Sequence, residues 1–302
     1  MTETDFKSGF VAVIGRPNVG KSTLINALLG QKIAAVSPKP QTTRRQQLGI
    51  LTGDTSQVVF VDTPGIHRPH HKLGQALNLA AEESLEGVDI VLWIVDLTSE
   101  PTDEERDIAE LLAHLRFKPD LVLGLNKMDL VPAEALEARR AAYRALVPEA
   151  FATPFSAATG TGLLPLFEAL LARLPVRPPE YDAESVTDLY EKDLAADLIR
   201  ESCLLHLSHE VPHSIAIRID EFTERKEEGA YIAATIFVER ESQKGIVIGQ
   251  GGVMLKKIGS AARTEIEKMS GRKVFLQLRV KVLKDWRNQE HLLRRFGYHL
   301  KK

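Results

Sequence analysis

Short apolar segments alternate with longer amphipathic segments over the first 175 residues of the chain. The apolar segments are rich in β-branched residues and bounded by Gly, Asp or Asn, which predicts buried strands at Phe10–Ile14, Val58–Val61, Ile90–Val95 and Leu121–Leu125. Apolar spacings of three and four predict helices at Ser22–Leu29, Leu73–Leu85, Asp103–Leu115 and Ala133–Leu146. A last strand and helix are expected at Phe151–Phe155 and Leu163–Leu174. This order predicts an α/β domain whose mostly parallel sheet is covered by helices on both faces.

The pattern changes after a proline-rich stretch that contains Pro175, Pro178 and Pro179. Such a composition favours an extended spacer over helix or sheet. We therefore expect a first domain at residues 1–175, a linker at 176–186 and a second domain at 187–302. In the second domain the pattern predicts the order α, β, β, α, α, β, α, a small α+β domain that includes a hairpin and a glycine-rich turn at Gly249–Gly252.

Length and composition agree with two folded domains. The chain has 302 residues, of which 44% are apolar, and single cores usually stop growing near this size. Its longest apolar runs are far shorter than the roughly 18 to 20 residues that span a bilayer, and residues 1–10 do not resemble a secretory signal. A cytoplasmic location is therefore expected. The single cysteine, Cys203, lies in an apolar helical pattern and is expected in a core.

The net charge of −2 hides an asymmetry along the chain. Residues 241–302 contain 15 Lys or Arg against 5 Asp or Glu, an excess of ten positive charges, so the preceding 240 residues carry −12. A basic block in a folded domain is consistent with a polyanionic partner, and equally with a solvated surface.

A phosphate-binding loop follows the first predicted strand. The segment GRPNVGKS at residues 15–22 matches the P-loop pattern and stands between a strand and a helix. Its glycines allow the backbone N–H groups to point at phosphates, Lys21 can reach the β- and γ-phosphates, and the Ser22 hydroxyl can bind Mg²⁺. The predicted nucleotide-binding residues here are Gly15, Arg16, Pro17, Asn18, Val19, Gly20, Lys21, Ser22 and Thr23.

The segment DTPG follows the second predicted strand and is expected beside the phosphate loop. A carboxylate at Asp62 can hold Mg²⁺, and Gly65 can offer its N–H to the γ-phosphate. The predicted nucleotide-binding residues of this segment are Asp62, Thr63, Pro64 and Gly65.

The segment NKMD follows the strand at 121–125 and selects the base. The Asp129 carboxylate can accept from both N1–H and the 2-amino group of guanine, whereas adenine has no such donor pair; unsatisfied buried groups can reject a wrong base by roughly 10⁴. A backbone N–H of Ser156-Ala157 is expected against guanine O6. The sequence thus predicts a GTP site that includes Asn126, Lys127, Asp129, Ser156 and Ala157.

These motifs, in this order and spacing, resemble the translation-factor-type P-loop GTPases. In that family a threonine of the first switch loop binds Mg²⁺; the matching segment is QTTR at 41–44, with Thr43 the preferred ligand and Thr42 an alternative. The predicted metal ligands are Ser22, Thr43 and Asp62. The position where Ras-like enzymes have a water-orienting Gln is Ile66, which implies slow hydrolysis or another positioning group.

Related GTPases with an asparagine at the place of Asn18 use a K⁺ ion in that role, so the resemblance implies hydrolysis stimulated by K⁺. The groups expected to act in hydrolysis are Lys21, Thr43, Gly65 and Asn18.

The glycine-rich turn in the basic region resembles the GxxG loop of a type II KH domain, an RNA-binding fold. Glycines there let a nucleic-acid backbone approach closely. The residues expected to contact single-stranded RNA are Lys244, Ile248, Gly249, Gln250, Gly251, Gly252, Val253, Lys256, Lys257, Arg272 and Lys273.

Together, the motifs GRPNVGKS, QTTR, DTPG, NKMD and GIVIGQGG resemble the Era family of bacterial GTPases over nearly the whole chain. The resemblance implies a monomeric GTP-hydrolysing switch that binds the 3′ end of small-subunit (16S) ribosomal RNA and assists assembly of the 30S subunit. It also implies a peripheral association with the inner membrane, an anionic surface. Two alternatives stay open: a nucleotide-gated RNA-binding scaffold with incidental hydrolysis, and a membrane-associated signalling GTPase.

Overall fold

The structure is a computed structural model that describes residues 6–39, 42–69, 71–225 and 229–300. Contacts divide the chain into two compact units. The first comprises Met1–Lys32, Thr43–Pro69 and Leu77–Asp188, and the second comprises Ile33–Thr42, His70–Ala76 and Leu189–Lys302. Each unit has its own sheet.

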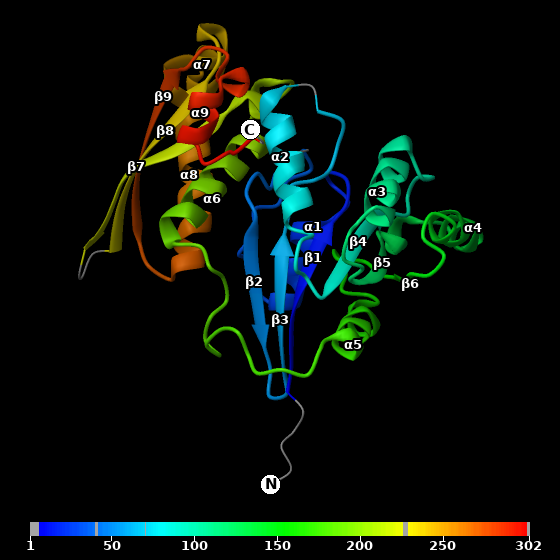
Figure 1. Cartoon of the computed structure of the whole chain (residues 1–302). Helices are drawn as coiled ribbons and strands as arrows, with labels where there is room; N and C mark the ends of the chain where they lie inside the picture. Colours follow the sequence, from blue (N-terminus) through cyan, green and yellow to red (C-terminus); the bar gives the residue numbers. More distant parts are fainter. Residues whose placement is uncertain (1–5, 40–41, 70, 226–228, 301–302) are drawn as a thin grey trace. The chain divides into compact units, whose positions relative to one another are not determined.

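The first unit contains a six-stranded sheet in the order β2-β3-β1-β4-β5-β6 (Figure 1). Its strands are β1 (Lys7–Ile14), β2 (Gln47–Thr52), β3 (Ser56–Asp62), β4 (Ile90–Asp96), β5 (Asp120–Asn126) and β6 (Phe151–Pro154). The helices of this part of the chain are α1 (Lys21–Leu29), α2 (Lys72–Glu83), α3 (Asp103–Ala113), η1 (Met128–Leu130), α4 (Ala133–Arg144) and α5 (Leu163–Arg173). All neighbouring strands are parallel except β2 and β3.

Both faces of this sheet are buried, as the sequence pattern predicts. Trp93 of β4 and Leu123 of β5 pack in one cluster with Ile108 of α3 and Tyr143 of α4. Alternate residues of the same strands, such as Leu92, are also fully buried. Because successive side chains of a strand point to opposite faces, helices must cover the sheet on both sides.

The strand β2 is absent from the prediction made on hydrophobic pattern. Its sequence, QLGILT, is short and contains a glycine and polar ends, so neither alternation nor a continuous apolar run marks it. It forms the antiparallel edge of the sheet against β3. The other five strands and the five predicted helices of this region are found where the pattern places them.

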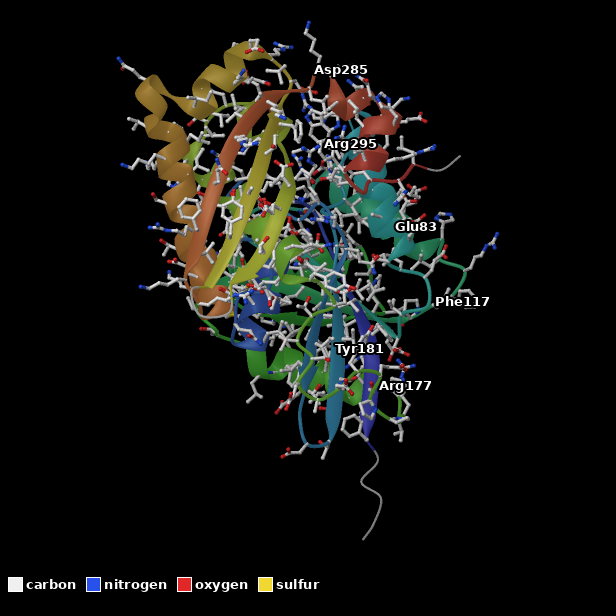
Figure 2. All side chains as sticks on the ribbon, turned by 90° about the vertical axis from the view of Figure 1, so that its left-hand side faces the viewer. Glu83, Phe117, Arg177, Tyr181, Asp285 and Arg295 are labelled. Carbon is white, nitrogen blue, oxygen red and sulfur yellow. The ribbon has the colours of Figure 1, made fainter. Side chains whose placement is uncertain are left out.

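The proline-rich stretch is closely attached to the first unit. Figure 2 shows Arg177 and Tyr181 beside the strands. Tyr181 packs edge-on against Phe10, and the Gln57 side chain donates to the Tyr181 carbonyl at 2.8 Å. Further on, Ile50 N donates to the Val186 carbonyl. The segment thus runs along the sheet, makes a turn in which Ser185 N donates to the Asp182 carbonyl, and ends against the edge of β2.

The second unit has the predicted order of elements. A three-stranded sheet, β7-β8-β9, has β7 antiparallel and β9 parallel to β8. Its strands and helices are α6 (Glu191–His206), η2 (Val211–Ser214), β7 (Ala216–Arg225), β8 (Gly229–Val238), α7 (Glu241–Ile248), η3 (Gln250–Gly252), α8 (Val253–Ser270), β9 (Val274–Val282), η4 (Trp286–Asn288) and α9 (Glu290–Arg295). Residues 226–228, which follow β7 in the sequence, lie outside the described residues.

The core of the second unit lies between its sheet and the helices α6 and α8. Ile199 of α6, Ile232 of β8 and Ile266 of α8 are fully buried in one cluster. Cys203 is fully buried in a neighbouring cluster, and this burial raises the pKa of its thiol to about 12. Its expected role in core packing is confirmed. Among the described residues no helix has the length and apolarity that a membrane span requires.

Candidate functional site

The phosphate loop connects β1 to α1 at the carboxyl edge of the parallel sheet. Gly15 has φ 142°, and a Cβ there would lie 2.2 Å from the Ile94 carbonyl oxygen. Gly20 has φ 102°, and a Cβ there would lie 2.2 Å from the Asn126 side-chain nitrogen. Both glycines are therefore required by backbone conformation and by close approach of neighbouring strands. The loop ends at the N-terminus of α1, where helix N–H groups favour an anion.

Lys21 is buried beneath this loop. Its Nζ donates to the carbonyl oxygens of Gly15 at 3.0 Å and Arg16 at 2.9 Å. Burial lowers the pKa of the Lys21 ammonium to about 8, against the opposing effect of the Asp62 charge. A bound polyphosphate would supply the negative charge that favours the protonated form of this side chain.

Three polar side chains converge beside Lys21. Ser22 Oγ donates to Asp62 Oδ2 at 2.9 Å, and Thr43 Oγ1 donates to the same oxygen at 3.1 Å. Asp62 is fully buried, and burial raises the pKa of its carboxyl, while Lys21 and hydrogen bonds from Ser22, Thr43 and Gln47 lower it.

These residues fit a magnesium ion. Asp62 Oδ1 is buried and has no hydrogen-bond partner among the described residues, and carboxylate and hydroxyl oxygens are suitable ligands for Mg²⁺. The two candidate threonines differ in position. Thr43 Oγ1 also lies 2.9 Å from Ser22 Oγ, whereas Thr42 Oγ1 donates to the Lys39 carbonyl. The geometry favours Thr43; Gln41 of the same segment lies outside the described residues.

The DTPG segment turns sharply after β3. The Thr63 hydroxyl donates to the Val13 carbonyl at 2.8 Å and so holds the turn rather than facing the loop. A Cβ at Gly65 would lie 2.6 Å from Pro17 N, so only glycine permits this closeness to the phosphate loop. The next side chain, Ile66, packs against the core cluster that contains Trp93. It therefore has neither the chemistry nor the position to orient water.

The NKMD segment and the Ser156-Ala157 segment lie at the ends of β5 and β6. Asn126 is buried; its Nδ2 donates to the Val19 carbonyl at 2.7 Å, and its Oδ1 accepts from Ala157 N at 2.9 Å. It thus ties the phosphate loop to the Ser156-Ala157 segment. Asp129 is exposed, so its carboxylate is open to a base. The contact of a backbone N–H of this segment with guanine O6 stays a prediction.

Two side chains that the sequence does not single out support this site. Gln47 Nε2 donates to Asp62 Oδ2 at 3.2 Å, and Asp96 Oδ2 lies 2.5 Å from Lys127 Nζ. Asp96 ends β4 directly opposite Asn126 in register. In the sequence, Asp96 could have been recognised as a site residue because it stands at the carboxyl end of a predicted buried parallel strand, where ligands bind in such sheets.

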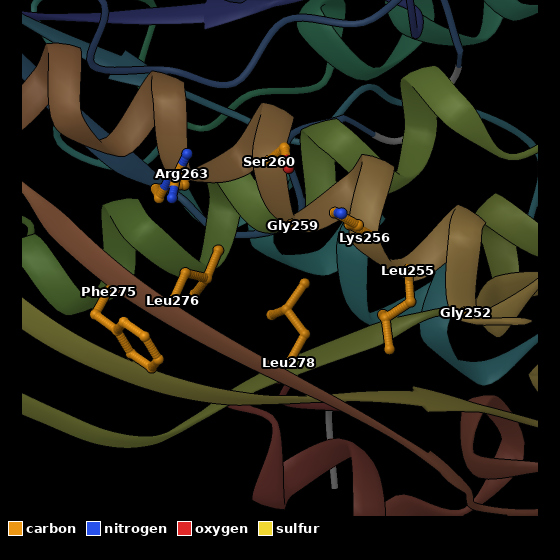
Figure 3. A pocket seen from close by; sticks show the side chains of 9 residues that line it. All are labelled: Gly252, Leu255, Lys256, Gly259, Ser260, Arg263, Phe275, Leu276 and Leu278. Carbon is orange, nitrogen blue, oxygen red and sulfur yellow. The ribbon is translucent and has the colours of Figure 1, made fainter.

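The GxxG loop borders a groove in the second unit. Gly251 has φ 59° and Gly252 has φ 81°, and a Cβ at either position would meet no atom within 4 Å. The groove has a volume of about 370 Å³ and lies between α8 and the edge strand β9 (Figure 3). It is lined by Gly252, Leu255, Lys256, Gly259, Ser260, Arg263, Phe275, Leu276 and Leu278.

The predicted RNA-contacting residues fall into two groups. Gly252 and Lys256 line the groove, and the rest of the segment 248–253 forms or borders its loop. Arg272 instead pairs with Glu191 and Glu224, and Lys244 lies 3.7 Å from Glu241. The Lys273 carbonyl accepts from Ala230 in strand pairing. A role in RNA binding stays a prediction for all of these residues and for exposed Lys257.

The opposite wall of the groove was missed by the sequence analysis. Phe275 and the alternating leucines of β9 come from a strand that follows the GxxG loop by more than twenty residues. Phe275 is 65% exposed, which is unusual for so large an apolar residue in a strand. The alternation of Leu276 and Leu278 with the exposed residues of β9 was the sequence signal.

Comparisons with known proteins agree with this geometry. Residues 10–127 match the family described as 50S ribosome-binding GTPase, and residues 210–287 match the KH domain family. The chain is 48% identical to GTPase Era of Geotalea uraniireducens over 299 residues, which cover 99% of this chain and all of that relative. It is also 48% identical to GTPase Era of Nostoc sp., covering 97% of this chain and 90% of the relative.

Two solved structures are similar over 98% of the chain and all of their own length, both at 38% identity. One is Era in complex with MgGDPNP and nucleotides 1506–1542 of 16S ribosomal RNA, with a TM-score of 0.93. The other is an Aquifex aeolicus Era variant bound to GDP and AlF₄⁻, with a TM-score of 0.92. The similarity therefore extends over both units.

Proposed function

This chain belongs to the Era family of GTPases, and from that premise we propose that it is a GTP-controlled switch that binds the 3′ end of small-subunit ribosomal RNA and assists 30S maturation. Hydrolysis of GTP to GDP and phosphate is the reaction of its first unit. The observation that carries the proposal is the presence, in one chain, of a GTP site and a GxxG groove. A relative of the same family has been solved with Mg²⁺, a GTP analogue and 16S rRNA nucleotides.

Each part of the nucleotide site has a defined task in this reaction. The backbone N–H groups of residues 15–22 and the Lys21 ammonium bind the phosphates, and Asp129 accepts from guanine. Ser22, Thr43 and Asp62 would hold Mg²⁺, which supplies positive charge beside the reacting phosphate when it is bound. Gly65, which lies so close to Pro17 of the phosphate loop that no side chain would fit, would donate its backbone N–H to the γ-phosphate.

Control by GTP requires that the two nucleotide states differ in their affinity for RNA. A difference in RNA affinity between the GTP-bound and the GDP-bound protein is therefore part of the proposal. On this proposal the protein acts in the cytoplasm, where ribosomal subunits assemble; contact with the inner membrane stays a prediction.

The proposal is tested by titrating the full-length protein into a labelled oligonucleotide of the rRNA 3′ end at near-physiological salt. The protein is loaded with a non-hydrolysable GTP analogue or with GDP, and a scrambled oligonucleotide is the control. Tight binding that needs both the native sequence and the GTP analogue is expected. Binding that ignores sequence and nucleotide would reduce the groove to an electrostatic anchor and contradict the proposal.

We infer in addition that hydrolysis is slow and is stimulated by K⁺. Ile66 packs against the core and cannot orient water, so hydrolysis needs help from another group, and a cation beside the phosphates can provide it by neutralising charge. Asn18 is exposed on the phosphate loop with φ 64°, and its side-chain oxygen is a suitable ligand for a monovalent cation. Turnover is expected to be faster in KCl than in NaCl of equal ionic strength, and Asn18→Ala should remove the difference. Equal turnover of the unmodified protein in both salts would refute the idea.

A further inference from the structure

The phosphate loop is attached to helix α3 by a buried ion pair that its motif does not specify. The Arg16 side chain extends from the loop, and its Nε donates to Glu105 Oε1 in the first turn of α3. The Glu105 side chain is 1% exposed and that of Arg16 is 20% exposed. The neighbouring Glu104 is more peripheral, with Oε2 at 3.9 Å from Arg16 NH1.

The second oxygen of Glu105 has a different task. Glu105 Oε2 accepts from Thr102 N at 2.8 Å and from the Thr102 hydroxyl, in the capping box that begins α3. A carboxylate at a helix N-terminus is also favoured by the helix dipole. One buried carboxylate therefore caps the N-terminus of α3 through one oxygen and contacts Arg16 of the phosphate loop through the other.

Arg16 is held at both its side chain and its backbone. Its carbonyl oxygen accepts from Lys21 Nζ at 2.9 Å, so the residue that contacts Glu105 also orients the lysine of the phosphate site. Removing one partner of a buried ion pair leaves an uncompensated charge and disturbs the groups around it.

We propose that Glu105 is a positioning residue for GTP binding: through Arg16 it holds the phosphate loop in the conformation that presents the backbone N–H groups and Lys21 to the phosphates. This role goes beyond the family's GTPase activity and does not depend on the RNA proposal. It assigns to α3 a direct part in the nucleotide site.

The surroundings of Glu105 reach the guanine side of the site as well. Tyr143 lies beside Glu105; burial raises the pKa of the Tyr143 hydroxyl to about 12, with a further contribution from the Glu105 charge. Tyr143 Oη donates to the Asp96 carbonyl at 3.0 Å, and Asp96 pairs with Lys127. Glu105 of α3 thus contacts the phosphate loop, and Tyr143 of α4 contacts Asp96 beside the NKMD segment.

The test separates the two tasks of Glu105. Glu105→Gln keeps an oxygen that accepts from Thr102, since a capping box takes Glu or Gln, and removes the negative partner of Arg16. Binding of a fluorescent non-hydrolysable GTP analogue to the full chain is expected to weaken about tenfold or more, because a buried charge has lost its partner. KM for GTP should rise more than kcat falls.

Two matched controls act on the same helix end. Thr102→Ala removes the cap hydroxyl and leaves the ion pair, so the melting temperature should fall while affinity for the analogue stays within about twofold. Glu104→Gln, on the adjacent half-buried carboxylate, should leave affinity within about twofold. If Thr102→Ala weakens binding as much as Glu105→Gln, the effect passes through helix stability and the proposal fails.

The partner side of the pair gives an independent check. Arg16→Met should weaken analogue binding as much as Glu105→Gln, and the double variant should be no weaker than either single variant, because all three remove one interaction. Circular dichroism establishes that each variant is folded. Affinity unchanged in folded Glu105→Gln or Arg16→Met, or additive losses in the double variant, would overturn the proposal.

Discussion

Glycines at the two candidate sites serve different physical purposes. In the phosphate loop, Gly15 and Gly20 are required by neighbouring atoms of the protein itself, because a Cβ would overlap Ile94 and Asn126. In the GxxG loop, Gly251 and Gly252 have positive φ and open space around the missing Cβ. The open space there is available to a ligand that approaches the backbone closely.

A substitution at Gly252 tests this reading of the groove. Gly252→Asp places a negative charge and a side chain at the mouth of the groove, so affinity for the rRNA oligonucleotide should fall about 100-fold or more, while GTP binding is unchanged. Gly271→Asp is the matched control, since Gly271 also has positive φ (67°) and open surroundings but ends α8 away from the groove lining. Fluorescence anisotropy measures both. RNA affinity that survives Gly252→Asp would refute the groove assignment.

At the level of elements, the edge strand β2 depends on residues far along the chain. Leu48 N donates to Asp188 Oδ1 at 2.9 Å, and Ile50 N donates to the Val186 carbonyl at 2.8 Å. An edge strand presents unpaired N–H groups that proteins usually cover. Here the residues that follow the proline-rich stretch, Val186 and Asp188, provide the cover and stabilise β2.

Removal of one of these contacts should loosen β2 selectively. Asp188→Ala deletes the acceptor for Leu48 N, a loss of about 1 kcal/mol of local stability, so amide exchange in residues 47–52 should accelerate roughly fivefold. Hydrogen–deuterium exchange with peptide resolution measures this, with β4 as the internal reference. Glu184→Ala, at an exposed position of the same segment, is the control. Exchange in β2 that is identical in Asp188→Ala and the unmodified protein would contradict the assignment.

Over the whole molecule, charge is divided unequally along the chain. Residues 241–302 carry an excess of ten positive charges, although the net charge of the chain is −2. Some of these cations are already paired within the second unit, such as Arg272 with Glu191. The expected RNA contacts are therefore fewer than the charge count suggests, and Lys256 is the lysine that lines the groove.

The salt dependence of RNA binding tests this distinction. Lys256→Gln should weaken binding of the rRNA oligonucleotide and reduce the slope of log K against log salt by about 0.7, the value for one phosphate contact on a single strand. Lys268→Gln, on the same helix but paired with Glu265 at 2.8 Å, should leave the slope unchanged. Equal slopes for Lys256→Gln and the unmodified protein would exclude a phosphate contact at Lys256.

The sequence alone determined those features whose chemistry is carried by neighbouring residues. The phosphate loop, DTPG and NKMD each follow a recognisable strand, and parallel strands end at one edge of a sheet, so their convergence around Lys21 and Asp62 could be predicted. The same holds for the GxxG loop, which is defined by four consecutive residues. Local spacing was sufficient in each case.

Tertiary structure alone decided the features that join distant segments. Arg16 and Glu105 are 89 residues apart, and Leu48 and Asp188 are 140 residues apart. The hydrogen bond from the Thr43 hydroxyl to Asp62 joins residues on different segments, and the second wall of the groove came from β9. Hydrophobic periodicity shows which face of an element is buried, but not which side chain of another element it meets there. Those pairings arise only when the chain is packed, because they depend on distances in space rather than on spacing in sequence.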